Sequence, residues 1–184
     1  LQSEKVYGNK LTNIVFMGMG EPLLNYKNVL QAIDKITSAD GMGMSPKRIT
    51  VSTAGVAKQI RQLGDDKVRF NLALSLHAAS DKKRDAIMPI NESNSIEVLV
   101  DALNYFYEQT KNDITLEYIL FKEVNDSLED ADDLIKIYRK IPTHLINVIE
   151  YNPIDNASFT KPDEDTTQQF TDYLAKHRVN VRLR

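Results

Sequence analysis

The chain has 184 residues with a net charge of −3; 42% are hydrophobic, 27% are charged and none is cysteine. This composition is ordinary for a globular protein, and the length suits a single domain over residues 1–184, with residues 1–12 as a leading segment. The lack of cysteine excludes disulfides, thiolate metal sites and cysteine nucleophiles from this chain, and the charge does not indicate a large basic surface for nucleic acid.

Short β-rich segments alternate with amphipathic ones along the sequence. We expect strands at residues 13–17, 48–52, 70–76, 114–121, 145–150 and 179–183. Several of them are nearly continuous apolar runs, which is typical of parallel strands covered on both faces. No apolar run approaches the ~20 residues that a membrane-spanning helix needs, and no secretory signal pattern opens the chain. We therefore expect no membrane partner and a cytoplasmic location.

Apolar stripes at helical spacing predict helices between these strands. The stripes are Val29, Leu30, Ile33 and Ile36; Ile96, Leu99, Leu103 and Phe106; Leu134, Ile135 and Tyr138; and Phe170, Tyr173 and Leu174. Ser95 is a candidate cap of the second helix, Asp126 with Glu129 resembles a capping box for the third, and Pro162 before Asp163 begins an acidic first turn of the fourth. Strands that alternate with helices predict an α/β fold with a mostly parallel sheet.

Small or hydrogen-bonding residues follow the expected strands. The segments are Gly18-Met19-Gly20-Glu21-Pro22, Ser52-Thr53-Ala54-Gly55, Ser75-Leu76-His77, Lys122-Glu123-Val124-Asn125 and Glu150-Tyr151-Asn152-Pro153. Ligands of parallel α/β folds lie at the carboxyl ends of the strands, so these segments predict one site at that rim. Because Glu21 precedes a proline, its backbone is restricted to extended geometry, which aims the carboxylate over the strand end.

Most of these residues also have a structural explanation. Glycines shape turns, serines cap helices, and Asn152 before Pro153 is a common turn pair. His77 alone is more often a structural histidine than a catalytic one. The run Lys82-Lys83-Arg84 is expected to be a solvated face near the rim.

The motifs GMGEPLLN, VSTAGV, SLHA, RDAIMPIN and EYNP follow one another as in one family. Their order and spacing resemble the radical S-adenosylmethionine RNA (adenine) methyltransferases of the RlmN/Cfr type, over nearly the whole chain from residue 13 to residue 184. MGMGEPLLN joined to SLHA and MPIN is far more specific than a glycine motif alone. The resemblance implies a partial (β/α)6 barrel of the radical S-adenosylmethionine type that lacks its first strand, and the RlmN type is the closer match.

The resemblance also implies which residues bind S-adenosylmethionine. Gly20 and Glu21 would contact the amino group of the cofactor, where a carboxylate offers a charge-assisted hydrogen bond. Ser52, the segment Ser75-Leu76-His77 and Asn152 would complete the cofactor site.

The family also needs residues that this chain lacks. Its members hold a [4Fe–4S] cluster on a CxxxCxxC loop and use a cysteine near the C-terminus that becomes methylated, whereas this chain contains no cysteine. We therefore expect the chain to be a fragment, starting after the cluster loop at Leu1, with no catalytic residue or metal ligand of its own and no activity alone. The complete enzyme is expected to methylate C2 of an adenosine in 23S rRNA and in some tRNAs.

Two other functions remain open from the sequence. A Cfr-like enzyme shares this scaffold and chemistry but methylates C8 of adenine. A non-catalytic barrel module that binds a nucleoside or RNA would also need no cysteine. Because the resemblance implies that the neighbouring first strand is missing, the strand at residues 13–17 would be an apolar sheet edge without charged or proline gatekeepers, so we expect self-association through that edge or its coverage by residues 1–11.

Overall fold

The computed structural model describes residues 2–153 and 158–184, in which six strands form one sheet in the order β1-β2-β3-β4-β5-β6. Each strand pairs in parallel with its neighbours. The strands are β1 Ile14–Phe16, β2 Ile49–Thr53, β3 Asn71–Ser75, β4 Ile114–Leu120, β5 Leu145–Glu150 and β6 Val181–Leu183. Every expected strand is present, β5 with the expected bounds, and the parallel α/β fold is confirmed.

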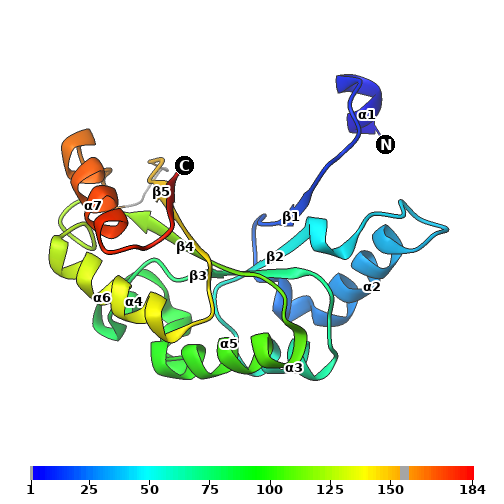
Figure 1. Ribbon diagram of the computed structural model, residues 1–184, viewed down its shortest axis with the longest axis horizontal. Helices are drawn as coiled ribbons and strands as arrows, with labels where there is room; N and C mark the ends of the chain where they lie inside the picture. The colour runs from blue at the N-terminus through cyan, green and yellow to red at the C-terminus, as the bar shows by residue number, and fades with distance from the viewer. Residues whose placement is uncertain (1, 154–157) are drawn as a thin grey trace.

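Helices cover one side of this curved sheet. The helices of the described residues are α1 Gln2–Tyr7, α2 Tyr26–Thr37, α3 Ala57–Asp65, α4 Asp81–Ile87, α5 Ile96–Thr110, α6 Leu128–Lys140 and α7 Glu164–Lys176, with short 3-10 turns η1 Pro22–Asn25, η2 Pro46–Arg48 and η3 Pro89–Ser93. Figure 1 shows α2 to α7 along the convex side of the sheet, while α1 extends away beyond β1. None of the described helices is long and apolar enough to cross a membrane.

The sequence analysis missed α3 and α4 for different reasons. The buried positions of α3 are Ala57, Ile60, Leu63 and Gly64, so half of its inner stripe consists of residues too small to register as hydrophobic. The buried residue of α4 is Arg84, a charged side chain that periodicity assigns to the surface. Pattern analysis detects only helices that bury large apolar side chains.

The expected caps of α6 and α5 need correction, and α6 is described first. The capping box of α6 is formed by Ser127 and Asp130, not by Asp126 and Glu129: Ser127 Oγ accepts from the Asp130 N–H at 3.2 Å, and the Ser127 N–H donates to Asp130 Oδ2 at 3.3 Å. Asp126 instead accepts from the Glu123 N–H, which closes the preceding turn.

At the other two helix starts the outcomes differ. Ser95 occupies the N-cap position of α5 without a side-chain cap bond, and the Ile96 N–H donates to Asp81 Oδ1 instead. The acidic start of α7 is confirmed, because Asp163 Oδ1 accepts from the Thr166 N–H at 2.7 Å.

The two faces of the sheet differ in polarity. In β4, Leu116 and Tyr118 are fully buried toward the helices, and the Tyr118 ring stacks on Phe170 of α7 with 5.7 Å between centroids. Successive side chains of a strand point to opposite faces, so Glu117 and Ile119 point to the concave side. The concave face therefore carries the charged residue of β4, Glu117, and a functional site is expected there.

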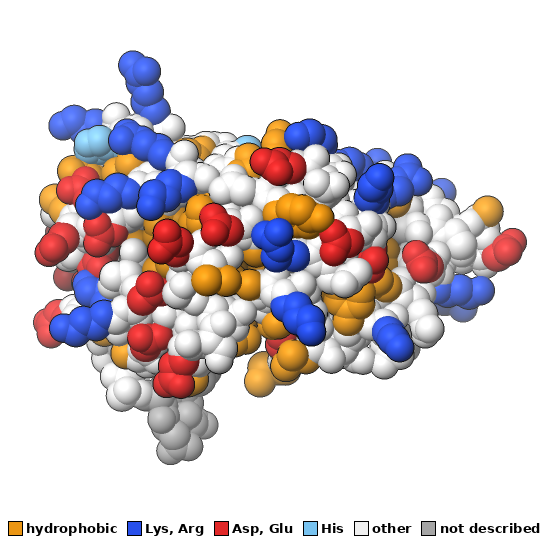
Figure 2. Space-filling view, turned by 90° about the horizontal axis from the view of Figure 1, so that it is seen from below, with side chains coloured by type: hydrophobic (Ala, Val, Ile, Leu, Met, Phe, Trp, Pro, Cys, Tyr) orange, Lys and Arg blue, Asp and Glu red, His pale blue; other side chains and the backbone are white. Residues whose placement is uncertain are grey.

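The helix-covered surface carries charges of both signs. Figure 2 looks onto the side below α3 and α5 and shows acidic and basic side chains interspersed over that face. This mixture agrees with the small net charge of −3.

Candidate functional site

A cavity of about 450 Å³ opens at the carboxyl ends of the strands, on the concave side of the sheet. Its volume falls in the range of about 300–1,000 Å³ that is usual for small-molecule sites. Of the residues selected from the sequence, Gly20, Glu21, Ser52, Ser75 and His77 line this cavity. The structure therefore brings together residues that lie on three different strand ends.

Glu21 joins two of those strand ends. Its backbone is extended, with φ −107° and ψ 109°, as the following proline requires. Glu21 Oε1 accepts from the Leu23 N–H at 2.9 Å and so caps η1, and Glu21 Oε2 accepts from the Ala54 N–H at 2.6 Å. A carboxylate has about four acceptor positions, so it retains capacity for a ligand donor.

Two serine hydroxyls lie side by side in the cavity wall. Ser52 Oγ and Ser75 Oγ are 3.4 Å apart on the neighbouring strands β2 and β3. Both line the cavity and are half-buried. A hydroxyl both donates and accepts, so this pair suits either a carboxylate or a hydroxyl of a ligand.

Leu76, also selected from the sequence, does not line the cavity. Its side chain is buried in the core. Its N–H donates to the Glu117 carbonyl at 2.9 Å, and its carbonyl accepts from Arg84 Nε at 3.0 Å.

The imidazole of His77 is a neutral donor that faces the cavity. His77 Nδ1 accepts from the Ile119 N–H at 3.1 Å, so the ring proton of the neutral form is on Nε2. Burial, with a smaller contribution from the Arg84 charge, lowers the pKa of His77 to about 4. At neutral pH the ring therefore offers the cavity an N–H without a positive charge.

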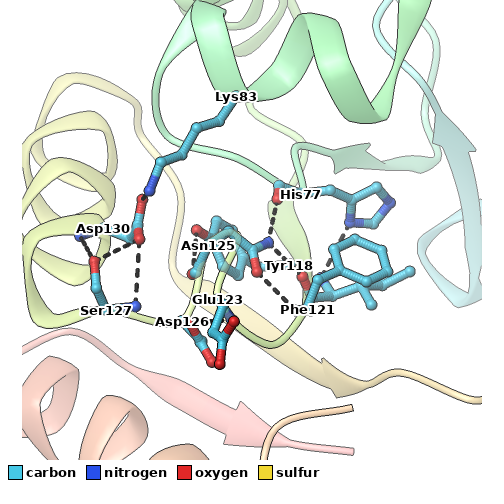
Figure 3. Close-up of polar contacts among 10 residues, drawn as sticks. His77, Lys83, Tyr118, Phe121, Glu123, Asn125, Asp126, Ser127 and Asp130 are labelled. Carbon is cyan, nitrogen blue, oxygen red and sulfur yellow. Dashed lines mark hydrogen bonds and ion pairs between the residues drawn. The ribbon is translucent and has the colours of Figure 1, made fainter. Parts of the chain in front are cut away.

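Asn125, in the loop after β4, fixes the backbone of His77 (Figure 3). The His77 backbone is left-handed, with φ +55°, and Asn125 Nδ2 donates both to its carbonyl at 2.6 Å and to the Ile119 carbonyl at 2.7 Å. Asn125 Oδ1 accepts from the Phe121 N–H, and the Tyr118 hydroxyl donates to the Asn125 carbonyl. These contacts hold an uncommon backbone geometry that would otherwise be costly.

Arg84 contradicts the expectation of a solvated basic face at Lys82-Lys83-Arg84. Its side chain is 0% exposed and donates to backbone carbonyls at the ends of β2 and β3. Lys83 does face outward, and its Nζ pairs with Asp130 Oδ1 at 2.5 Å (Figure 3). A run of cations gives no sign of which member is buried, which is why the sequence analysis missed Arg84.

Glu117 is a second carboxylate of the cavity that the sequence analysis missed. It is 4% exposed, and its Oε1 accepts from Asn147 Nδ2 at 2.7 Å. Burial raises the pKa of Glu117, while the Asn147 hydrogen bond, the charge of Arg184 and Thr115 oppose this shift. A glutamate inside the apolar run ITLEYIL was the available signal, because a charged residue is rarely buried without a role.

Asn152 is, after Leu76, the second predicted site residue that the structure leaves outside the cavity. It follows β5 at the same rim, but its side chain is exposed and does not line the cavity. The residues after Pro153, 154–157, lie outside the described part of the chain.

The cavity suits S-adenosylmethionine better than an iron–sulfur cluster. Glu21, two hydroxyls and the His77 N–H are hydrogen-bonding groups of the cavity, and Ile119 and Ile149 provide an apolar wall, a combination that fits a polar small molecule with apolar parts. A [4Fe–4S] cluster needs thiolates, which a chain without cysteine cannot supply. Within the described residues, no group of histidine, aspartate and glutamate is placed to hold a metal ion.

Comparison with known proteins gives consistent results. The model of the radical SAM superfamily matches residues 3–135. A probable dual-specificity RNA methyltransferase RlmN of Cytophaga hutchinsonii is 52% identical over 99% of this chain, which covers 50% of that protein. The dual-specificity RNA methyltransferase RlmN of Nautilia profundicola is 40% identical over 96% of the chain. The chain spans about half the length of these relatives, 50% and 49%.

Solved structures agree on the fold. A radical SAM methyltransferase from Sphaerobacter thermophilus superposes with a TM-score of 0.94 at 33% identity, over 100% of this chain and 53% of that protein. A domain of a pyruvate-formate lyase-activating enzyme from Bacteroides vulgatus gives a TM-score of 0.71 at 16% identity, which shows a shared fold only.

Proposed function

The chain belongs to the radical SAM superfamily and is a homologue of RlmN, and from this premise we propose that it is the cofactor-binding part of an RNA methyltransferase. The proposed reaction of the complete protein is methylation of C2 of an adenosine in 23S rRNA and in tRNA. This choice follows the relatives, whose names describe dual-specificity RNA methyltransferases.

One observation carries the proposal. Five of the seven residues that the resemblance assigns to S-adenosylmethionine converge from three strand ends on one cavity, although they are spread over the sequence from Gly20 to His77. The parallel sheet brings the strand ends together, and the sequence places a carboxylate, two hydroxyls and an imidazole N–H on them.

Each residue has a role that its contacts permit. Glu21, already oriented by two backbone N–H groups, accepts from the amino group of the cofactor. The hydroxyls of Ser52 and Ser75 bind polar groups of the methionyl and ribose parts, and the His77 N–H donates to an oxygen. Asn152 follows β5 at the same rim, and its proposed contact with the cofactor rests on the resemblance.

The radical chemistry itself depends on groups that this chain does not hold. A [4Fe–4S] cluster would supply the electron that cleaves S-adenosylmethionine to a radical, and its cysteine ligands would come from the remainder of the complete protein. We therefore propose that the chain alone is inactive and binds S-adenosylmethionine weakly or undetectably, because the cluster that would anchor the cofactor is missing, although the residues that would orient it remain.

The test is product analysis with the complete, cluster-loaded protein. Incubation with S-adenosylmethionine and 23S rRNA or tRNA, followed by digestion and mass spectrometry, is expected to give 2-methyladenosine. Formation of 8-methyladenosine would assign the protein to the Cfr type instead. RNA that stays unmethylated while the protein binds RNA would favour a non-catalytic binding module.

A further inference from the structure

We infer that Arg84 is a positioning residue of the cofactor site, which fixes the ends of β2 and β3 relative to each other. This inference rests on the proposed function for what the cavity binds. It does not require Arg84 to touch the cofactor, because Arg84 does not line the cavity.

Arg84 binds three backbone carbonyls from two neighbouring strand ends. Nη2 donates to the carbonyls of Ala54 at 2.6 Å and Ser75 at 3.2 Å, and Nε donates to the Leu76 carbonyl at 3.0 Å. Nη1 donates to Asn91 Oδ1 at 2.7 Å. A guanidinium has a rigid, planar set of donors, so these bonds define the distance and angle between the two strand ends.

These carbonyls lie where the sheet ladder stops. Past the last paired residues the chain turns away, and buried carbonyls need another partner. Ala54 is held from both sides, because its N–H donates to Glu21 Oε2 and its carbonyl accepts from Arg84. Through Ala54, Arg84 is therefore connected to the carboxylate proposed to bind the cofactor.

The charge of Arg84 is balanced through Asn91. Asn91 Nδ2 donates to Asp81 Oδ1 at 3.0 Å and to Asp85 Oδ1 at 2.7 Å, while its Oδ1 accepts from Arg84. Burial lowers the pKa of Arg84 to about 10, and the charges of Asp81 and Asp85 oppose this shift. The guanidinium stays protonated at neutral pH, so all of its donors remain available.

Gly55 shows that little free space surrounds the guanidinium. A Cβ on Gly55 would lie 3.2 Å from Arg84 Nη2 and 3.0 Å from Leu99, and the backbone there has φ +105°. The loop after β2 therefore lies directly against the arginine. A smaller or differently shaped side chain at position 84 would let this loop shift.

If Arg84 only stabilised the core, a different experimental result would be expected. Its loss would lower the free energy of unfolding, but it would affect the cavity no more than the loss of any other buried polar residue. Asn112 provides that comparison: it is 2% exposed, accepts from Lys47 Nζ and donates to the Val68 carbonyl at the opposite strand ends.

The experiment compares Arg84→Met, Arg84→Lys and Asn112→Ala in the complete, cluster-loaded protein. Calorimetric titration with S-adenosylmethionine is expected to show Arg84→Met binding about tenfold more weakly or worse, and Arg84→Lys in between, because an ammonium cannot reach all the carbonyls. Asn112→Ala is expected to stay within about twofold of wild type, since distant sites act independently. Equal affinity of Arg84→Met and wild type, or an equal loss in Asn112→Ala, would overturn the inference.

A second measurement needs neither the cluster nor the cofactor. Amide exchange of this chain is read at Ala54 and Leu76, whose N–H groups bond to Glu21 and Glu117, and at Leu72, whose N–H bonds to Asp113 at the other end of β3. Arg84→Lys, the milder variant, is expected to accelerate exchange at Ala54 and Leu76 by about tenfold and to leave Leu72 unchanged. Equal acceleration of exchange at all three amides would show that Arg84 stabilises the core in general and does not specifically fix the strand ends.

The two measurements separate the inference from the proposed function. If the wild-type complete protein does not bind S-adenosylmethionine, the proposed function fails, and the amide exchange still decides whether Arg84 fixes the strand ends.

Discussion

The carboxylate of Glu21 and the backbone N–H of Ala54 are 2.6 Å apart, although 33 residues separate them in the sequence. This hydrogen bond ties the loop after β1 to the loop after β2, while the other carboxylate oxygen caps η1. Glu21 therefore has a structural role in addition to the proposed contact with the cofactor.

Replacing Glu21 tests its proposed contact with the cofactor. Glu21→Ala removes the acceptor for the cofactor's amino group, and we expect the affinity of the complete protein for S-adenosylmethionine to fall by roughly 1.5–3 kcal/mol. Glu21→Gln keeps one acceptor oxygen and should lose less. Calorimetric titration of both variants measures the effect, and an unchanged affinity in Glu21→Ala would remove Glu21 from the cofactor site.

The lowered pKa of His77 predicts that the free energy of unfolding depends on pH. Its folded pKa of about 4 lies below the ordinary value of 6.5, so the unfolded chain binds more protons between these two pH values. Stability should therefore fall as the pH drops through this window, by on the order of 3 kcal/mol from His77 at pH 4. The reference is His77→Asn, because asparagine tolerates a left-handed backbone and does not titrate.

The difference in unfolding free energy between the wild type and His77→Asn isolates this histidine from other titrating groups. Urea denaturation at several pH values between 7 and 4 measures it. A difference that stays constant over this range would contradict a depressed pKa.

The cluster prediction concerns the chain by itself. Without cysteine, its strong nitrogen ligands are limited to His77, His144 and His177, which belong to different elements. After anaerobic incubation with iron and sulfide we expect a colourless protein that does not cleave S-adenosylmethionine. A stoichiometric brown product with a cubane spectrum would disprove this.

Asn152 gives a test at the rim after β5. Because its side chain is exposed and outside the cavity, a role only in the turn with Pro153 predicts normal turnover in Asn152→Ala. The proposed cofactor contact instead predicts weaker binding and slower turnover, which is the outcome we expect. Steady-state kinetics of the complete protein with varied S-adenosylmethionine distinguishes the two.

The outer edge of β1 gives a prediction about association. β1 is an edge strand, and among the described strands it pairs with β2 alone. In and directly after β1, Val15 and Met17 are 58% and 41% exposed. We propose that isolated chains associate through this edge, because an apolar strand without charged or proline gatekeepers is a template for pairing. Light scattering with amide exchange at residues 14–16 tests it. A monomer with freely exchanging amides would contradict it.

Much of the fold follows from the sequence because apolar periodicity reports burial directly. The strands and the helices with large apolar stripes, such as α5 and α6, were predictable for this reason. The polar side chains that support the site were not. Arg84 and Asn125 satisfy buried carbonyls contributed by residues far away in sequence, and no local pattern shows that such carbonyls need a partner.

Some of the site residues could likewise be selected from the sequence, and others could not. Gly20, Glu21 and His77 stand at strand ends in recognisable motifs, so they could be selected from the sequence. Glu117 lies in the middle of β4, and only the alternation of faces in the folded sheet places it toward the cavity.

The strand order of the sheet has a consequence for how the protein is made. Each strand pairs with the one that precedes it in the sequence, so a chain growing from its N-terminus always offers a finished neighbour to the next strand. The contacts that connect Glu21, Ala54 and Arg84 involve only residues up to Asn91. Ribosomes add about 5–20 residues per second, and folding begins at the N-terminal part. This half of the rim can therefore assemble vectorially, while the last strands are still being translated.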